Sequence, residues 1–114
     1  MNITSAVAFT TKGSVLSAKI CGEIDHHSVR SVRKELDAAI YTNRPKEVVI
    51  DLDDVCFMDS SGLGLIVGRV VSAREVGATL ALVNVPTRVF RIFEMAGLSR
   101  TEGLTINIKK GDLL

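Results

Sequence analysis

The segment from Glu47 to Leu52 constrains the fold most, because it is an almost unbroken run of apolar, mostly β-branched residues. Such a run is typical of a strand that is buried on both faces, as parallel strands usually are. Pro45 precedes it and pushes Arg44 out of the right-handed helical region, so a helix before this strand must end near Asn43. We therefore predict a central strand over 47–52 in an α/β fold.

Strand-like and helix-like segments alternate around this strand. Strands are predicted over 3–10, 14–21, 78–84 and 104–108, and Thr11-Lys12-Gly13 has the composition of a hairpin turn between the first two. Right-handed crossovers through helices make later strands parallel. The predicted fold is an α/β sandwich: a mixed sheet of about five strands, with an N-terminal hairpin and parallel later strands, covered by about three to four helices.

Apolar residues recur at helical spacing in three segments. The first helix begins after Asp25 or Ser28, either of which can cap it, the second runs from about Ser61 to Val76, and the third begins at Pro86 and ends at Gly97. Their predicted core faces are Val29, Val32, Leu36, Ala39 and Ile40, then Leu63, Ile66, Val67, Val70 and Ala73, then Val89, Phe90, Phe93 and Ala96. From Lys109 onward we predict a frayed end.

The composition of the chain argues against several classes of partner. A chain of 114 residues with 46% hydrophobic and 24% charged residues suits a single domain over 1–114. A formal charge of +1, no Trp and one Tyr argue against a nucleic acid partner. The sequence contains no signal peptide pattern and no long apolar window, so we expect a cytoplasmic protein without a membrane partner. We expect Cys21 and Cys56 to be reduced, buried thiols.

The stretch from Phe57 to Gly64 joins the end of the strand region to the start of a helix, where open α/β sheets place their ligands. The first backbone N–H groups of a helix lack intrahelical partners and attract negative charge. Asp59, Ser60 and Ser61 can all accept from them. Ser60 therefore fits two roles, a simple N-cap or a site that tolerates an anion.

Three glycines, Gly62, Gly64 and Gly68, fall in the first half of that helix, and each destabilises it by about 1 kcal/mol relative to alanine. Gly64 and Gly68 lie four residues apart, so one side of the helix lacks side chains at these positions and has a surface of low relief. Either the sheet or another protein could approach that side closely.

A second polar loop, from Gly22 to Ser28, also lies between a strand and a helix, and we expect it at the same edge as Ser60. Adjacent histidines are not expected to point the same way, and with no thiolate motif nearby His26 and His27 argue against zinc. Asp25, His26 and Ser60 are the residue types of a hydrolytic triad, but the GxSxG elbow is absent and a carboxylate adjoins the serine. Phosphate-loop motifs are absent as well, so no cofactor is expected.

Several motifs together resemble one family, the anti-anti-sigma factors, whose domain type is shared with sulfate transporter C-terminal regions and is called STAS. The resemblance covers roughly residues 14–98. It rests on GEIDHHS at 22–28, VVIDL at 48–52, FMDSSGLG at 57–64, Gly68-Arg69, and RIFEMAGL at 91–98. The Asp-His-His and Met-Asp-Ser-Ser-Gly-Leu-Gly pair is most similar to members that control sigma F during sporulation.

This resemblance implies a non-enzymatic switch that takes no cofactor or metal. The unphosphorylated protein binds an anti-sigma factor, which is a serine kinase with bound nucleotide, and releases the sigma factor. Phosphorylation at Ser60 abolishes binding, and a serine phosphatase restores it. The resemblance places partner contacts at Asp25, His26, Asp59, Ser61, Gly62, Leu63 and Gly64. It also implies a final helix, which the residues after Leu98, with Gly103 and Gly111, do not themselves predict.

Two alternatives remain at this stage. A STAS domain of a general stress-response pathway, acting as a switch or a scaffold, would carry the same motifs, and a serine hydrolase would need a reactive Ser60 or Ser61. The residues alone accept a phosphate on either serine, and Ser60 is preferred only through the family resemblance.

Overall fold

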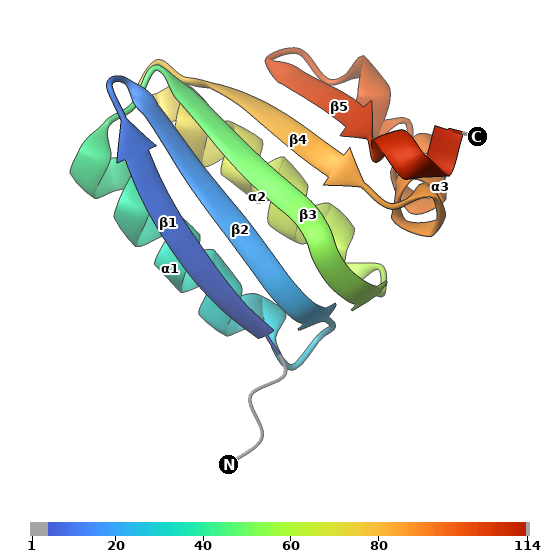
Figure 1. Cartoon of the computed structure of the whole chain (residues 1–114). Coiled ribbons are helices and arrows are strands. Elements are labelled where there is room, and N and C mark those ends of the chain that lie inside the picture. The colour runs from blue at the N-terminus through green and yellow to red at the C-terminus, as the bar shows by residue number, and fades with distance from the viewer. Residues whose placement is uncertain (1–4, 114) are drawn as a thin grey trace.

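The apolar run after Pro45 forms the middle strand of a five-stranded sheet (Figure 1). The structure is a computed structural model that describes residues 5–113. In spatial order, which is also chain order, the strands are β1 (Ser5–Lys12), β2 (Val15–Ile24), β3 (Glu47–Met58), β4 (Thr79–Val85) and β5 (Leu104–Ile108). The pair β1–β2 is antiparallel and the other three neighbouring pairs are parallel. The predicted mixed α/β sheet is therefore confirmed.

The hairpin differs from the prediction by a few residues. β1 continues to Lys12, which pairs with Val15, and the turn lies at Gly13, whose φ of 61° is in the left-handed region that glycine favours. Ile3, where we predicted the first strand to begin, lies outside the described residues.

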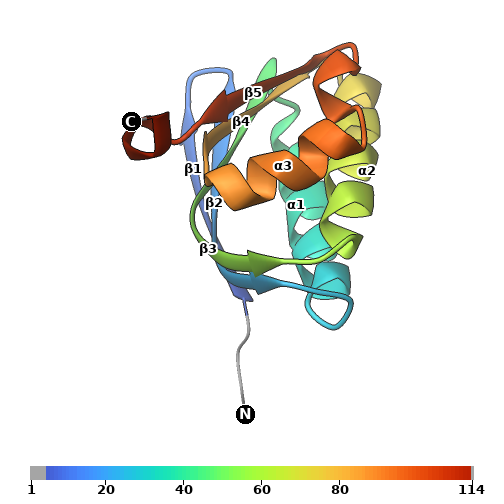
Figure 2. The same cartoon turned by 90° about the vertical axis from the view of Figure 1, so that its right-hand side faces the viewer.

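Within residues 5–113, three α-helices and two short 3₁₀ turns complete the fold: α1 (Val29–Asn43), α2 (Ser61–Glu75), α3 (Thr87–Met95), η1 (Leu98–Arg100) and η2 (Lys110–Leu113). α1 and α2 lie side by side on one face of the sheet (Figure 2). α1 ends as predicted, because Arg44 before Pro45 has a φ of 45° and leaves the right-handed helical region. η2 corrects the predicted frayed end, and it stands where the family resemblance implied a final helix.

The core lies between the helices and the covered face of the sheet. Every second residue over 16–20 of β2 and over 48–52 of β3 enters it, together with one face of α1: Leu16, Ala18, Ile20, Val48, Ile50, Leu52, Val32, Leu36 and Ile40. Burying one such aliphatic side chain fully contributes about 1.5–3 kcal/mol. The strand ends are held in the same core, through the buried side chains of Ile24 and Met58.

β3 is longer than predicted, since the residues from Asp53 to Met58 continue the strand instead of forming a connection. Ion pairs explain how acidic residues are accommodated there: Asp53 lies 2.8 Å from Lys109 Nζ, and Asp54 lies 3.3 Å from Lys19 Nζ. Pairing of β3 with β4 ends at Asp51, whereas pairing with β2 continues to Met58. Because β1 pairs with β2 only as far as Gly22, the last pairs among the described residues, Glu23–Phe57 and Ile24–Met58, form a two-stranded ribbon, β2–β3.

Some predicted burial was wrong. α2 turns Leu65, Ile66, Val70 and Ala73 inward, leaves Leu63 half-buried and exposes Val67, whose relative exposure is 43%. Ala96 is exposed because it lies beyond the end of α3, although Val89 and Phe93 are buried as predicted. Neither cysteine is buried: both are free, with Cys21 half-buried and Cys56 exposed on β3. Among the described helices, none is both long and apolar enough to span a membrane.

Candidate functional site

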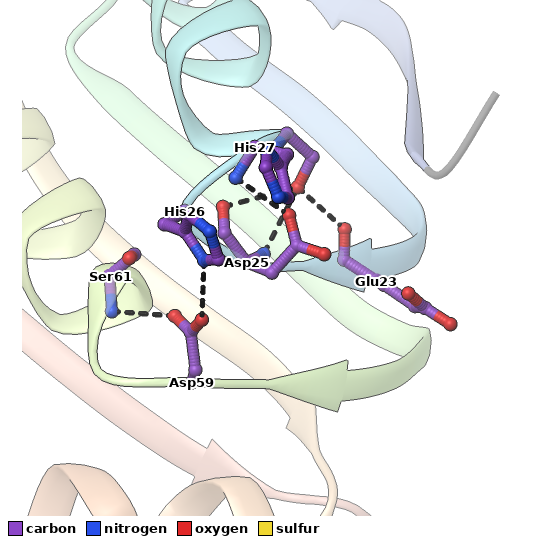
Figure 3. Close-up of polar contacts among 7 residues, drawn as sticks. Glu23, Asp25, His26, His27, Asp59 and Ser61 are labelled. Atoms are coloured by element: carbon purple, nitrogen blue, oxygen red, sulfur yellow. Dashed lines mark hydrogen bonds and ion pairs between the residues drawn. The ribbon is translucent and has the colours of Figure 1, made fainter. Parts of the chain in front are cut away.

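The loops that follow β2 and β3 meet at one edge of the sheet, as predicted (Figure 3). Strand pairing brings them together, because Ile24 is in register with Met58 at the end of the ribbon. The backbone N–H of Asp59 then donates to the carbonyl oxygen of Ile24 at 3.1 Å. Asp25 and Ser60 thus lie on neighbouring loops although 35 positions separate them in the sequence.

Asp25 holds the first loop in shape. Its Oδ1 accepts hydrogen bonds from the backbone N–H groups of His27 and Ser28, both at 2.9 Å. In return, Ser28 Oγ accepts from the Asp25 N–H at 3.1 Å and donates to the Glu23 carbonyl oxygen at 2.8 Å. The bond from the Ser28 N–H is the main reason why the pKa of Asp25 is lowered. Ser28 takes the N-cap position of α1, while the Asp25 carboxylate fixes the turn before it.

Asp59 performs the corresponding task in the second loop. Its Oδ1 accepts from the backbone N–H of Ser61 at 2.8 Å, and its Oδ2 lies 3.7 Å from His26 Nδ1 (Figure 3). The Ser61 N–H is the main cause of a lowered pKa for the Asp59 carboxyl. Asp59 therefore both caps the start of α2 and contacts the neighbouring loop.

Ser60 occupies the N-cap position of α2, but its side chain makes no capping hydrogen bond. Its backbone is already helical, with φ −61° and ψ −18°, and Asp59 serves the N–H of Ser61 in its place. The predicted capping role of the Ser60 side chain is therefore wrong. The residue is exposed, whereas Ser61 is half-buried.

The three glycines of α2 have different surroundings. A Cβ on Gly62 would lie 2.4 Å from Met58 Sδ, so this glycine permits close packing inside the molecule. A Cβ on Gly64 or Gly68 would meet no atom within 4 Å. The side of α2 that lacks side chains at Gly64 and Gly68 therefore does not serve packing against the sheet. It borders solvent, with Val67 and Val71 exposed beside it.

The histidines do not complete a catalytic or metal site in the described structure. The rings of His26 and His27 lie side by side, with centroids 4.0 Å apart and a tilt of 40°, contrary to the expectation that they diverge. Oδ1 of Asp25 accepts hydrogen bonds from backbone N–H groups, and the ion-pair contact of His26 is with Asp59. Among residues 5–113, no group of three metal-ligating side chains comes together. Asp25, His26 and Ser60 are therefore neighbours without the connections of a hydrolytic triad.

A groove that the sequence did not reveal lies between the first turns of α1 and α2. We call it the α1–α2 groove; its volume is about 380 Å³ and its lining residues are His26, Val29, Arg30, Arg33, Ser61, Gly64 and Leu65. Arg30 and Arg33 lie on the exposed face of α1, and the packing of α1 beside α2 cannot be seen in the sequence of either helix alone. The lack of a side chain at Gly64 keeps the groove open.

Comparison with known proteins shows similarity over most of the chain. Residues 6–110 match the STAS domain. The anti-sigma F factor antagonist of Paenibacillus polymyxa is 39% identical over 84 residues, which cover 74% of this chain and 72% of that protein. The anti-sigma-B factor antagonist of Listeria monocytogenes is 40% identical over 81 residues, covering 70% and 69%. The structure of the anti-sigma factor antagonist SpoIIAA in its unphosphorylated form is similar with a TM-score of 0.75 and 25% identity, covering 95% and 92%.

Proposed function

This chain belongs to the STAS domain family, and from that membership we propose that it is an anti-sigma factor antagonist switched by phosphorylation of Ser60. Its unphosphorylated form binds an anti-sigma factor serine kinase with its bound nucleotide, and the sigma factor held by that kinase is released. The names of its relatives support the antagonist role. The protein acts as a binding partner and not as an enzyme.

One observation carries the choice of Ser60: the side chain is exposed at the first turn of α2 and takes no part in capping it. Asp59 supplies the capping acceptor. A phosphate on Ser60 therefore removes no capping hydrogen bond, and the fold survives the modification. Ser61 is a poorer acceptor of phosphate because it is half-buried in the α1–α2 groove.

In the proposed reaction, the kinase transfers the γ-phosphoryl group of ATP to Oγ of Ser60 in this chain. The O–H bond of the serine breaks, the new P–O bond forms, ADP leaves, and the proton passes to a base of the kinase. A serine phosphatase hydrolyses the phosphoester with water and restores the hydroxyl. The switch is therefore reversible without any change of fold.

The physical effect of the phosphate is a change of charge at the contact. It adds about −1.5 to −2 charges next to the Asp59 carboxylate. A shift of partner binding from 99% to 1% needs roughly 5.5 kcal/mol of differential affinity, which a charged group desolvated without partners can supply. The proposed contact surface comprises residues of both loops and the start of α2: Asp25, His26, Asp59, Ser61, Gly62, Leu63 and Gly64.

The test is incubation with the cognate anti-sigma kinase and ATP, followed by mapping of the phosphate by mass spectrometry. Wild type should carry one phosphate on Ser60, Ser60→Ala none, and the matched control Ser61→Ala one. Ser60→Ala should bind the kinase permanently, whereas Ser60→Asp should bind poorly. Phosphate found elsewhere, or equal affinity of the Ala and Asp variants, would contradict the proposal.

A second candidate is the same switch, or a scaffold, in a general stress-response pathway. The 40% identity to the anti-sigma-B factor antagonist of Listeria monocytogenes supports it about as well as the 39% identity supports the sigma F assignment. Purifying the sigma factor that the protein displaces from its kinase would decide between them.

A further inference from the structure

The α1–α2 groove is positively charged. Its charge comes from Arg30 and Arg33, which stand one turn apart on its α1 side. None of its lining residues carries a carboxylate, and the neighbouring Asp59 carboxylate is engaged with His26 and the Ser61 N–H. Because the whole chain has a formal charge of only +1, this concentration of cations is a local feature.

The nearest acidic partner of these cations on α1 is already engaged. Asp37, one turn after Arg33, lies 2.9 Å from Arg69 Nε and also accepts a hydrogen bond from Ser72 Oγ at 2.8 Å. Arg33 is close enough to Arg69 for their repulsion to lower the pKa of Arg69, after the larger effect of burial. Asp37 is thus paired with Arg69, and among the described residues no ion pair joins it to Arg33.

Side chains, and not helix N–H groups, determine what the groove can bind. The first N–H groups of α2 are already paired: Ser61 N–H with Asp59 Oδ1, Gly62 N–H with the Asp59 carbonyl, and Leu63 N–H with the Ser60 carbonyl. Recognition therefore falls to the two guanidinium groups, which bind planar carboxylates through paired hydrogen bonds. Both arginines are exposed, so the groove would not enclose a small molecule as ligand pockets do.

The groove is continuous with the surface of the proposed function, since His26, Ser61 and Gly64 belong to both. We propose that it receives a carboxylate side chain from an acidic segment of the anti-sigma partner, held by Arg30 and Arg33. This inference rests on the proposed function. It adds Arg30 and Arg33 to the contact surface and requires the contacting segment of the partner to be negatively charged. Because Gly64 has no side chain, the α1–α2 groove has space for the acidic segment of the partner.

Exposed charges at the border of an interface act mainly on the rate of association, and salt screens them. The test compares Arg30→Ala/Arg33→Ala with Lys34→Ala/Arg91→Ala, a control that removes two exposed cations outside the groove. Both are made in a Ser60→Ala background, and association with the kinase is followed by stopped flow at low and physiological salt. We expect about a tenfold lower association rate constant for the groove variant at low salt, a smaller difference at higher salt, and a change of less than about twofold for the control.

The outcomes separate the two proposals. Failure of the unmodified chain to bind the kinase overturns both. Normal binding of the Ser60→Ala protein with equal rates for the groove and control variants overturns the groove inference alone. Repeating the measurement with nucleotide-free kinase distinguishes a carboxylate from a nucleotide phosphate: the effect should persist, and its disappearance would overturn the assignment to a carboxylate. Circular dichroism spectra equal to wild type show that both variants fold.

Discussion

Arg69 Nε lies 2.9 Å from Oδ1 of Asp37, so that a cation buried on α2 meets a carboxylate of α1. The contact is an ion pair by distance, yet neither Nε nor Nη1 of Arg69 has a hydrogen-bond partner of good geometry among the described residues. Burial lowers the pKa of Arg69. The pair joins the two helices that border the α1–α2 groove.

Loss of Asp37 should therefore destabilise the fold. Asp37→Ala leaves the Arg69 charge buried without its partner, and we expect the free energy of unfolding in urea to fall by about 2 kcal/mol, less than for a fully buried pair because Asp37 is 29% exposed. The double variant Asp37→Ala/Arg69→Met removes both charges and should be more stable than Asp37→Ala alone. A double variant that is less stable would show that the pair does not act through the buried charge.

Capping of α2 should depend on Asp59 and not on Ser60. Asp59→Ala removes the acceptor of the Ser61 N–H and should lower the free energy of unfolding by about 1 kcal/mol. Ser60→Ala, which removes no capping bond, should change it by less than about 0.5 kcal/mol. Thermal and urea unfolding of the two variants side by side provide the measurement, and a larger loss for Ser60→Ala would contradict the described geometry.

The glycines of α2 should respond differently to alanine. Gly62→Ala forces the buried Met58 side chain to shift, which offsets the gain in helix propensity, so this variant should be less stable than Gly64→Ala by about 1 kcal/mol or more. Gly64→Ala meets open space and should stabilise the fold by up to about 1 kcal/mol, with Gly68→Ala as a matched control. If Gly64 lies in the partner contact, Gly64→Ala should also weaken kinase binding, measured by calorimetry, despite the gain in stability.

Stability at low pH should depend on Asp25. Hydrogen bonds, first of all from the Ser28 N–H, place its folded-state pKa below the ordinary value of 3.8. A carboxyl whose pKa is lowered by folding stabilises the protein above the unfolded-state pKa, and this stabilisation is lost as the pH falls through the folded-state value. Urea unfolding between pH 6 and pH 2 should thus show a shallower acid decline for Asp25→Asn than for wild type. Parallel curves would contradict the prediction.

The order of elements could be predicted from the sequence because each signal was local. The β-branched run and Pro45 predicted where the middle strand lies and where the first helix stops. Gly77 and Gly97, which follow the ends of α2 and α3, predicted where these two helices stop, and the structure agrees. The junction of the two loops also followed, since parallel strands end at the same edge of a sheet.

Features that depend on contacts between distant segments could not be predicted. Acidic residues made the second half of β3 look like a loop, but Lys19 and Lys109, far along the chain, neutralise Asp54 and Asp53. The exposure of Val67 and the burial of Arg69 depend on how α2 is rotated against α1, which neither helix specifies alone. The α1–α2 groove was missed for the same reason.

Among the described residues, the last two strand pairs before the site, Glu23–Phe57 and Ile24–Met58, join β2 and β3 alone, and both loops of the site are continuations of these two strands. To move Asp25 away from Asp59, the molecule would have to separate the last pairs of the ribbon, at Ile24 and Met58. The entropy of arranging the two loops is therefore lost during folding and not during encounter with a partner. A binding partner meets both halves of the site already in position, and any local opening of the ribbon would release them together.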